Sequence, residues 1–331
     1  MDTELKKIKQ EVSSLTDKLV DLKKEIAKVI IGQEESVDHL LITFLAGGHA
    51  LLEGVPGLAK TLMIKTLAQA IDLQFKRIQF TPDLMPSDII GTEILEEDHT
   101  TGKKFFEFNK GPIFANIILA DEINRTPPKT QSALLEAMSE RSVTIDGTSH
   151  HLGEGFLVIA TQNPIEQQGT YPLPEAQLDR FMFKHVLEYP SEAEERSIVA
   201  MHGHQTSMPK LDEFGMKGVA DLEKLEEMRS IVRTIRLNPD ITNYIVSVVR
   251  ATREHPALQF GGSPRSATML AAASRAYAAL QGRDYVIPDD VKFVAIPGLH
   301  HRVVLAPSAE IEGTRTNNVI REILEQTAAP R

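Results

Sequence analysis

The stretch "GVPGLAKT" at residues 54–61 restricts the possible folds of this chain more than any other feature of the sequence. It follows the apolar segment "HALLEG" at 49–54 and leads into "KTLMIKTLAQAI" at 60–71, whose apolar spacing predicts a helix. At such a strand–turn–helix junction, consecutive backbone N–H groups surround an anion where the helix dipole already favours negative charge. The sequence therefore predicts an α/β fold that contains a phosphate-binding loop.

This loop departs at one position from the pattern Gly-x-x-x-x-Gly-Lys-Ser/Thr, because Ala59 stands where the second glycine is expected. We expect Ala59 in the first turn of the helix, where a right-handed backbone accepts alanine and one methyl group intrudes least. Lys60 would then reach the β- and γ-phosphates of a nucleotide, and Thr61 would offer its hydroxyl to Mg²⁺. The alternative, an ordinary turn that binds no nucleotide, is disfavoured by the strand before it and the helix after it.

Further apolar runs predict a sheet around this loop. Three more strands are expected, at 75–80, 116–122 and 156–164. Helix-length stretches separate them, which is typical of a doubly wound parallel sheet. Two other segments alternate around predicted turns, and we expect both to project from the sheet as hairpins: 91–111 around Thr101–Gly102, and 142–152 around Asp146–Gly147.

Polar residues follow two of these expected strands. Asp121 and Glu122 end the run "NIILADE" at the carboxyl edge of the sheet, where parallel α/β folds bind ligands. Because unpaired buried charge is costly, adjacent carboxylates there indicate a ligand, with two solvated acids at a loop start as the alternative. We expect Asp121 to hold the Mg²⁺ shell and Glu122 to polarise the attacking water. Asn163, after another apolar strand, could orient that water or the γ-phosphate.

The chain is predicted to contain three parts. Residues 1–28 are expected to form one helix with a heptad seam of Leu5, Ile8, Val12, Leu15, Leu19, Leu22 and Ile26, which continues to Val29. Residues 29–190 are expected to form the nucleotide-binding core with its two hairpin inserts, and 191–331 a second, smaller, all-helical domain. The N-terminal helix would either dock on its own domain or pair with another chain as a coiled coil.

Two arginines are candidates for contact with phosphate. In "GGSPRS", Ser263 is a predicted N-cap and Pro264 the first helical residue, so Arg265 would oppose the helix dipole unless an anion lies nearby. A γ-phosphate would supply that anion, and so would a surface carboxylate. Arg180 in "PEAQLDRF" could instead pair with Asp179 on a surface helix.

Composition excludes several classes of protein. The net charge of −10 argues against a duplex-binding surface, so a nucleic acid partner is not expected. The absence of cysteine excludes disulfides and thiolate metal sites and fits a reducing compartment. The N-terminus is charged from its second residue, and no apolar run approaches the ~18 residues that span a bilayer, so a cytoplasmic protein without membrane insertion is predicted. The histidine pairs lack metal-ligand spacing and are expected at the surface: His150–His151, His202 with His204, and His300–His301.

The segments "GVPGLAKT", "ADEINRTPPKTQSALLEAMSER", "ATQNP", "LPEAQLDRF" and "GGSPRS" together resemble the MoxR family of AAA+ ATPases, from about residue 29 to the C-terminus. In that family, alanine before the lysine is usual. The resemblance implies a P-loop AAA+ domain with a helical lid domain, and ATP and Mg²⁺ as ligands. It also implies roles for single residues: Lys60 and Thr61 in Walker A, Asp121 and Glu122 in Walker B, Asn163 as sensor 1, Arg180 as the arginine finger and Arg265 as sensor 2.

The same resemblance implies which residues contact the nucleotide and what the inserts are. Segments 92–111 and 142–152 match the helix-2 insert and the pre-sensor-1 hairpin of the family. The segment "VIIGQEES" matches the one that packs on the adenine. The expected contacts are Ile31, Gly32 and Gln33 near the base, and Gly54, Val55, Pro56, Gly57, Leu58, Ala59, Lys60, Thr61 and Leu62 along the phosphate loop.

The function implied by the resemblance is a Mg²⁺-dependent ATPase that assembles into a ring, hexameric in the family, and remodels a client protein. Family members often act beside partners that contain von Willebrand factor A domains. Two alternatives stay open. One is a nucleotide-gated scaffold in which the heptad helix acts and ATP switches assembly. The other is a nucleic-acid motor, against which the acidic balance and the lack of a separate DNA-binding domain count.

Overall fold

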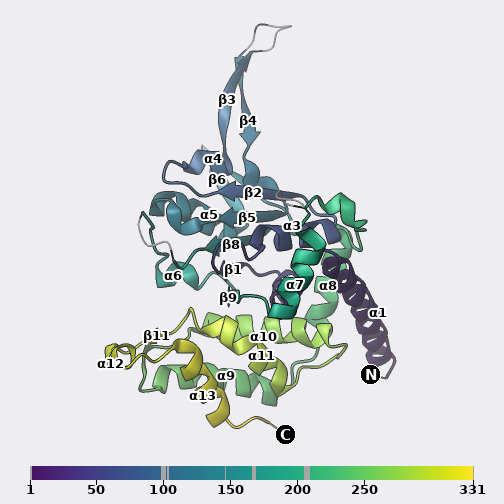
Figure 1. The fold of residues 1–331 in the computed structure, drawn as a ribbon, viewed down its shortest axis with the longest axis vertical. Helices are drawn as coiled ribbons and strands as arrows, with labels where there is room; N and C mark the ends of the chain where they lie inside the picture. The colour runs from purple at the N-terminus through teal and green to yellow at the C-terminus, as the bar shows by residue number, and fades with distance from the viewer. Residues whose placement is uncertain are drawn as a thin grey trace.

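A five-stranded parallel sheet lies at the centre of the structure, a computed structural model (Figure 1). The structure describes residues 2–97, 102, 104–145, 147–165, 169–204 and 209–330, and of residues 2–5 the backbone alone. The strands lie in the order β2-β5-β8-β1-β9, and each adjacent pair is parallel. Their bounds are β1 Ala50–Glu53, β2 Phe75–Gln79, β5 Ile117–Asp121, β8 Leu157–Gln162 and β9 Phe183–Val186.

Both faces of this sheet are buried, as a doubly wound fold requires. Along β5, Ile117 and Leu119 belong to one apolar cluster, whereas Ile118 and Ala120 belong to the other. The first cluster extends from the N-terminal helix to the C-terminal helices, and the second packs under α5 and the hairpin β6–β7. The predicted parallel α/β sheet is therefore confirmed.

Helices account for most of the remaining described residues. The helices before the last strand of the sheet are α1 Asp2–Ala27, α2 Glu34–Ala46, α3 Lys60–Ala70, α4 Pro86–Ile90, α5 Pro128–Glu140 and α6 Glu175–Leu178. Those after it are α7 Glu192–His202, α8 Leu222–Thr234, α9 Pro239–Glu254, α10 Pro264–Leu280, α11 Pro288–Leu299, α12 Pro307–Ile311 and α13 Thr316–Gln326. Three 3₁₀ turns join them: η1 Pro112–Phe114, η2 Ile123–Arg125 and η3 Leu211–Phe214. None of the helices in the described part of the chain is long and apolar enough to cross a membrane.

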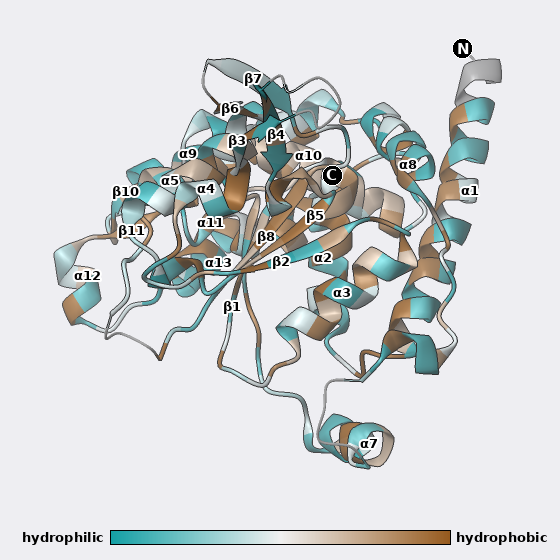
Figure 2. Cartoon of the chain, turned by 90° about the horizontal axis from the view of Figure 1, so that it is seen from above, coloured by the Kyte–Doolittle hydropathy of each residue, from teal (hydrophilic) through white to brown (hydrophobic). Residues whose placement is uncertain are grey.

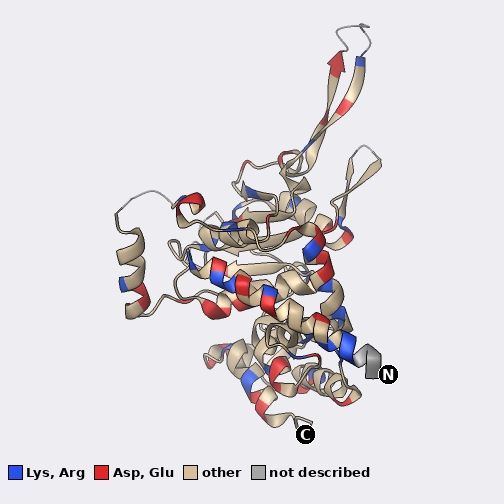
Figure 3. Ribbon diagram, turned by 90° about the vertical axis from the view of Figure 1, so that its right-hand side faces the viewer, with Lys and Arg blue, Asp and Glu red and all other residues tan. Residues whose placement is uncertain are grey.

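The heptad helix α1 packs on its own chain. Its seam residues Val12, Leu15, Leu19, Leu22 and Ile26 are each at most 2% exposed and join the main apolar cluster. The helix contacts α3, α8 and α10, while its outward face carries the Lys, Glu and Asp residues seen in Figure 3. Of the two arrangements open from the sequence, docking on its own domain is the one in the structure.

Both predicted hairpins are present. β3 Gly91–Glu97 pairs antiparallel with β4 Lys104–Lys110, and the pair projects from the body of the molecule (Figure 1). β6 Ser142–Ile145 pairs likewise with β7 Thr148–His151. Of the two predicted turns, Thr101 and Asp146 lie outside the described residues.

The segment after residue 190 is mainly helical, but it is not all-helical as predicted. Two short strands, β10 Leu258–Phe260 and β11 Val304–Leu305, form an antiparallel pair. Helix α7 stands apart from the other helices in two views (Figures 2 and 3), and none of its residues is fully buried. The two-stranded pair was missed because strands of two or three residues carry no periodic signal.

Candidate active site

The predicted phosphate loop connects the end of β1 to the start of α3. The Lys60 ammonium donates a hydrogen bond to the carbonyl oxygen of Gly54 at 2.5 Å, across the base of the loop. Gly57 has a φ of 92°, and a Cβ built there meets no atom within 4 Å. The loop therefore places the lysine beside a turn that is open to a ligand.

Ala59 does not adopt the conformation that we predicted for it. It is the N-cap of α3, with a φ of 54° and a ψ of 23°, which is left-handed rather than right-handed. The reason is that this residue precedes the helix instead of entering it, and the chain must still curl so that its N–H groups converge. Left-handed backbone favours glycine, which explains the glycine of the general pattern at this position.

Asp121 and Glu122 are held in place by a threonine on the neighbouring strand. The Thr161 hydroxyl on β8 donates to Asp121 Oδ1 at 2.5 Å and accepts from the backbone N–H of Glu122 at 2.9 Å. Arg77 on β2 donates through Nε to Asp121 Oδ2 at 2.8 Å. Glu122 itself has a left-handed backbone, with a φ of 57°.

The Glu122 carboxylate has two donors. Gln79 Nε2 donates to Glu122 Oε2 at 2.8 Å, and Arg125 donates to the same oxygen at 2.9 Å. The sequence reasoning assigned no role to Arg77, Gln79 or Thr161. Alternation along the strand "FKRIQ" puts Arg77 and Gln79 on one face, but only the register Gln79↔Asp121 brings them to the carboxylates.

The loop and the carboxylates line one open cavity of about 570 Å³, which the charged residues Lys60, Asp121 and Glu122 help to form. Burial lowers the pKa of Lys60, and the nearby carboxylates of Asp121, Glu122 and Glu53 oppose that shift. Asn163 is buried, and its Oδ1 accepts from the backbone N–H of Ile165 at 3.2 Å. The lining residues are Pro56, Gly57, Ala59, Lys60, Thr61, Leu62, Asp121, Glu122, Asn163 and Pro209.

A second, mostly apolar cavity of about 390 Å³ adjoins the first, since Pro56, Gly57, Ala59 and Leu62 line both. The predicted residues Ile31, Gln33 and Leu58 line it, and so do Val29 and Ile30 of the segment "VIIGQEES" that was predicted to pack on the adenine. The other lining residues were not predicted: Met63, Tyr189, Pro190, Glu195, Ile198, Val199 and His202. Gly32, Gly54 and Val55 line neither cavity. Gly32 instead lies against Glu194 of α7, whose Oε1 would be 2.0 Å from a Cβ built there. A cavity that contains Lys60 and the two carboxylates, joined to a more apolar one, matches the needs of a phosphate chain and a base.

Arg180 and Arg265 line neither cavity of their own chain. Arg180 donates to the carbonyl oxygen of Leu135 at 2.7 Å and to the Ser139 hydroxyl, both on α5. The suggested pair of Asp179 with Arg180 does not form, because Asp179 binds Arg302 Nε at 2.9 Å. The pKa of Arg302 is lowered to about 10, mainly by burial, while Asp179 opposes the shift and the charge of Arg265 adds to it. Arg265 itself is exposed.

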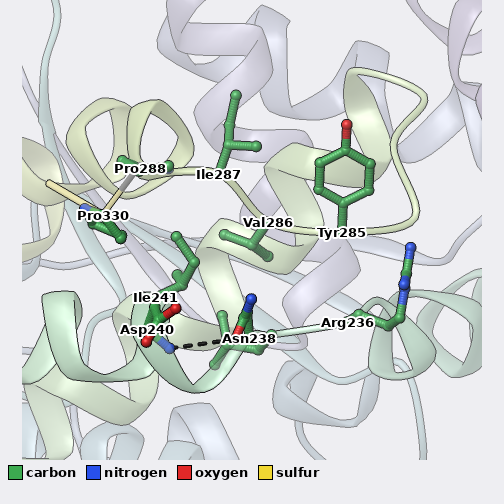
Figure 4. Close-up of a pocket in the computed structure, with 10 residues that line it drawn as sticks. Arg236, Asn238, Asp240, Ile241, Tyr285, Val286, Ile287, Pro288 and Pro330 are labelled. Atoms are coloured by element: carbon green, nitrogen blue, oxygen red, sulfur yellow. Dashed lines mark hydrogen bonds between the residues drawn. The ribbon is translucent and has the colours of Figure 1, made fainter.

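Other polar features lie away from these two cavities. A cavity of about 760 Å³ between the starts of α9 and α11 (Figure 4) is lined by Arg236, Leu237, Asn238, Asp240, Ile241, Tyr285, Val286, Ile287, Pro288 and Pro330, none of which was predicted to contact nucleotide. The prediction of surface positions is wrong for His301, which is 7% exposed and hydrogen-bonds the carbonyl oxygen of Phe181 at 3.0 Å. His300 is half-buried, whereas His151 and His204 are exposed.

These features define a P-loop nucleotide hydrolase: a parallel sheet with a phosphate loop after β1, a carboxylate pair after β5 and a helical segment at the C-terminal end. Comparison with known proteins agrees. Residues 49–183 match the model of the ATPase family associated with various cellular activities (AAA), and residues 250–323 match the AAA lid domain.

Individual relatives indicate which family of AAA ATPases the chain belongs to. The chain is 45% identical to Chaperone MoxR1 of Mycobacterium tuberculosis over 93% of this chain and 81% of that protein. It is 47% identical to the uncharacterized protein YeaC of Bacillus subtilis over 92% of each. A solved structure of a proposed ATPase from Cytophaga hutchinsonii superposes with a TM-score of 0.89 at 41% identity, over 99% of both chains. The chain belongs to the MoxR family of AAA+ ATPases, and it is an ATPase with a helical lid domain.

Proposed function

We propose that this ATPase forms a ring, requires Mg²⁺, and uses hydrolysis to remodel client proteins. The observation that carries the proposal is that Lys60, Thr61, Asp121, Glu122 and Asn163 line one cavity. The Thr61 hydroxyl and the Asp121 carboxylate supply the oxygen donors that Mg²⁺ prefers. When bound, Mg²⁺ would neutralise charge on the β- and γ-phosphates.

Within this proposal each residue has a distinct task. Lys60 binds phosphate, and the apolar cavity with Ile31 and Gln33 binds the base. Glu122 orients and polarises the attacking water, and the donors Gln79 and Arg125 hold its carboxylate in position. Asn163 places the γ-phosphate or the water.

The positions of Arg180 and Arg265 support assembly into a ring. Both lie outside the cavities of their own chain, whereas phosphoryl transfer gains most from an arginine at the γ-phosphate. A neighbouring subunit would supply that phosphate, so we infer that both act across a subunit boundary in a closed, hexameric ring. We assign residues 29–190 to the ATP-binding core and 191–331 to the lid with its linker.

One relative is named Chaperone MoxR1, and we extend a chaperone-like role to this chain. We infer a cytoplasmic protein whose partner contains a von Willebrand factor A domain. A nucleotide-gated scaffold would show the same ATP binding with turnover that is independent of assembly. A nucleic-acid motor would show DNA-stimulated turnover that falls with salt.

The test compares Glu122→Gln with Lys60→Ala. We expect Glu122→Gln to bind ATP and to hydrolyse it at least ~10²-fold more slowly, because water activation is lost while phosphate contacts stay. We expect Lys60→Ala to lose binding, because the lysine contacts phosphate before any chemistry. Fluorescent-nucleotide titration and phosphate release measure the two effects, and hydrolysis by Glu122→Gln at the parent rate would refute the role of Glu122.

A further inference from the structure

A pair of histidines lies between α2 and β9, outside the lining of both nucleotide cavities. His39 on α2 is 2% exposed, and its Nδ1 lies 3.1 Å from Nδ1 of the half-buried His185 on β9. Glu35, one turn before His39, completes a group in which a ring nitrogen of each histidine and a carboxylate oxygen lie within 4.8 Å of one another. The rings of Phe183 and Phe293 pack against His39 at centroid distances of 5.3 and 5.0 Å, which limits its rotation.

A chain of hydrogen bonds fixes which nitrogen of His185 carries a proton. The carbonyl oxygen of Glu188 can only accept, so the Gln33 atom 2.9 Å from it is the Nε2 donor, and Gln33 Oε1 then accepts from the Ser36 hydroxyl at 2.8 Å. Ser36 Oγ has used its proton, so it accepts from His185 Nε2 at 2.7 Å. His185 Nε2 is therefore protonated, and in the neutral ring Nδ1 presents a lone pair towards His39.

Both rings are neutral near pH 7. The pKa of His39 is lowered to about 3, mainly by burial and in part by the neighbouring His185. Burial also lowers the pKa of His185 to about 4, with a smaller contribution from His300. Neutral imidazole is the form that binds metal ions, so protons do not compete for these nitrogens at physiological pH.

We propose that His39 Nδ1, His185 Nδ1 and the Glu35 carboxylate form a binding site for a transition-metal ion of the Zn²⁺ class. Two nitrogens bound to one tetrahedral Zn²⁺ lie roughly 3.3 Å apart, close to the separation in the structure. One carboxylate with two imidazoles and an open fourth position is a ligand set that Zn²⁺ accepts. Ser36 would act as the outer partner that orients His185 through its Nε2–H.

The ion would tie α2 to β9, because Glu35 and His39 belong to α2 and His185 belongs to β9. Gln33, at the start of α2, lines the apolar nucleotide cavity and belongs to the same hydrogen-bond chain as His185. A bound metal ion would therefore restrict the motion of the segment around Gln33, which we propose to bind the base of the nucleotide. The alternative without metal is a direct hydrogen bond from His39 Nδ1–H to His185 Nδ1, and titration with a metal ion separates the two.

The experiment titrates the full-length, nucleotide-free protein with Co²⁺ in excess Mg²⁺, which competes with Co²⁺ for oxygen donors such as Thr61 and Asp121. We expect one equivalent of Co²⁺ to bind with the intense visible absorption of a tetrahedral ion, and Zn²⁺ to displace it. Glu35→Gln should weaken binding by at least ~10-fold and His185→Gln should abolish the band. His151→Ala removes an exposed histidine on β7 and should leave the titration unchanged.

The proposal is overturned if the parent protein shows no tetrahedral Co²⁺ band. It is also overturned if Glu35→Gln binds Co²⁺ as tightly as the parent. Glu35 is exposed, so this variant is expected to fold and decides the question even where His185→Gln does not fold.

Discussion

Ala59 stands where the phosphate-loop pattern has its second glycine, and the backbone conformation of this residue shows why glycine is usual there. A left-handed conformation at a residue that carries a Cβ costs roughly 1 kcal/mol relative to glycine. The chain accepts this cost at Ala59, directly before Lys60, because the loop requires the curl. Sequence reasoning identified the loop, but it placed Ala59 inside the helix and argued its tolerance for alanine from a right-handed backbone, which the structure does not have.

Replacement of Ala59 tests this conformation. We expect Ala59→Gly to keep ATP binding and turnover near the parent level and to raise the free energy of unfolding by about 0.5–1 kcal/mol, because glycine is unstrained there. Ala59→Val should lose ATP binding, because a β-branched side chain disfavours this backbone and would crowd the β-phosphate. Nucleotide titration and urea denaturation measure both effects, and normal affinity in Ala59→Val would show that residue 59 is misplaced.

His49 links a strand to a helix through a fixed tautomer. Its Nδ1 accepts from the Val158 N–H at 3.0 Å, and its Nε2–H donates to the carbonyl oxygen of Met138 at 3.1 Å. Burial lowers its pKa from 6.5 to about 4. Protonation of Nδ1 would break the bond to Val158, so the folded state excludes the charged ring.

This arrangement predicts a pH dependence of stability. The stabilisation by neutral His49 is fully present above pH 6.5 and is lost as the pH falls towards 4, because the unfolded chain takes up the proton first. The free energy of unfolding should therefore decrease by up to about 1.4 kcal/mol per pH unit for this group. His49→Gln should remove that part of the slope in urea denaturation, and His151→Gln should not. An NMR titration of His49 with a midpoint near 6.5 in the folded protein would contradict the prediction.

At the scale of elements, α1 shows how much of a helix's packing can be predicted from a heptad pattern. The periodicity predicted the helix and its buried face, but not the surface that covers it, because an apolar seam packs equally well on another helix of the same chain or of a second chain. Contacts of α1 with α8 and α10, more than 190 residues later in the chain, decide the question.

A matched pair of substitutions on α1 tests this packing. Leu19 is 2% exposed and Val20 is 45% exposed. We expect Leu19→Ala to lower the free energy of unfolding by about 2–5 kcal/mol and Val20→Ala by less than about 1 kcal/mol. Subunit number, measured by light scattering at equal concentration, should be the same in both. A change of subunit number in Leu19→Ala with no loss of stability would mean that α1 pairs between chains.

The sheet and the polar ends of its strands were predictable because they depend on local patterns. The apolar run before Asp121 and the glycines before Lys60 each identify their element within a few residues. The donors Arg77 and Gln79 were not predictable as partners of the carboxylates, because their role depends on β2 lying beside β5. Strand order is set by packing of the whole domain, and no single stretch of sequence encodes it.

At the scale of the whole molecule, the residues proposed for catalysis do not all lie together in one chain. Its cavity contains Lys60, Glu122 and Asn163, whereas Arg180 and Arg265 lie elsewhere. The hydrogen bonds of Arg180 to α5 use part of its five-donor guanidinium and hold the side chain in a defined place. A residue fixed on one surface can serve a site on a second subunit without any rearrangement of its own domain.

Mixing two inactive proteins tests whether Arg180 acts across the subunit boundary. We expect Arg180→Ala to bind ATP normally and to lose about 10³- to 10⁵-fold in hydrolysis, roughly 4–7 kcal/mol of barrier, because the charge on the transferred phosphoryl group is no longer stabilised. Lys60→Ala keeps Arg180 and lacks phosphate binding. In a mixed ring, an intact cavity of the first variant can lie beside Arg180 of the second, so ATPase activity should appear on mixing. Differently tagged subunits, co-purified, verify that mixed rings form, and mixed rings without activity at every ratio would exclude a finger that acts in trans.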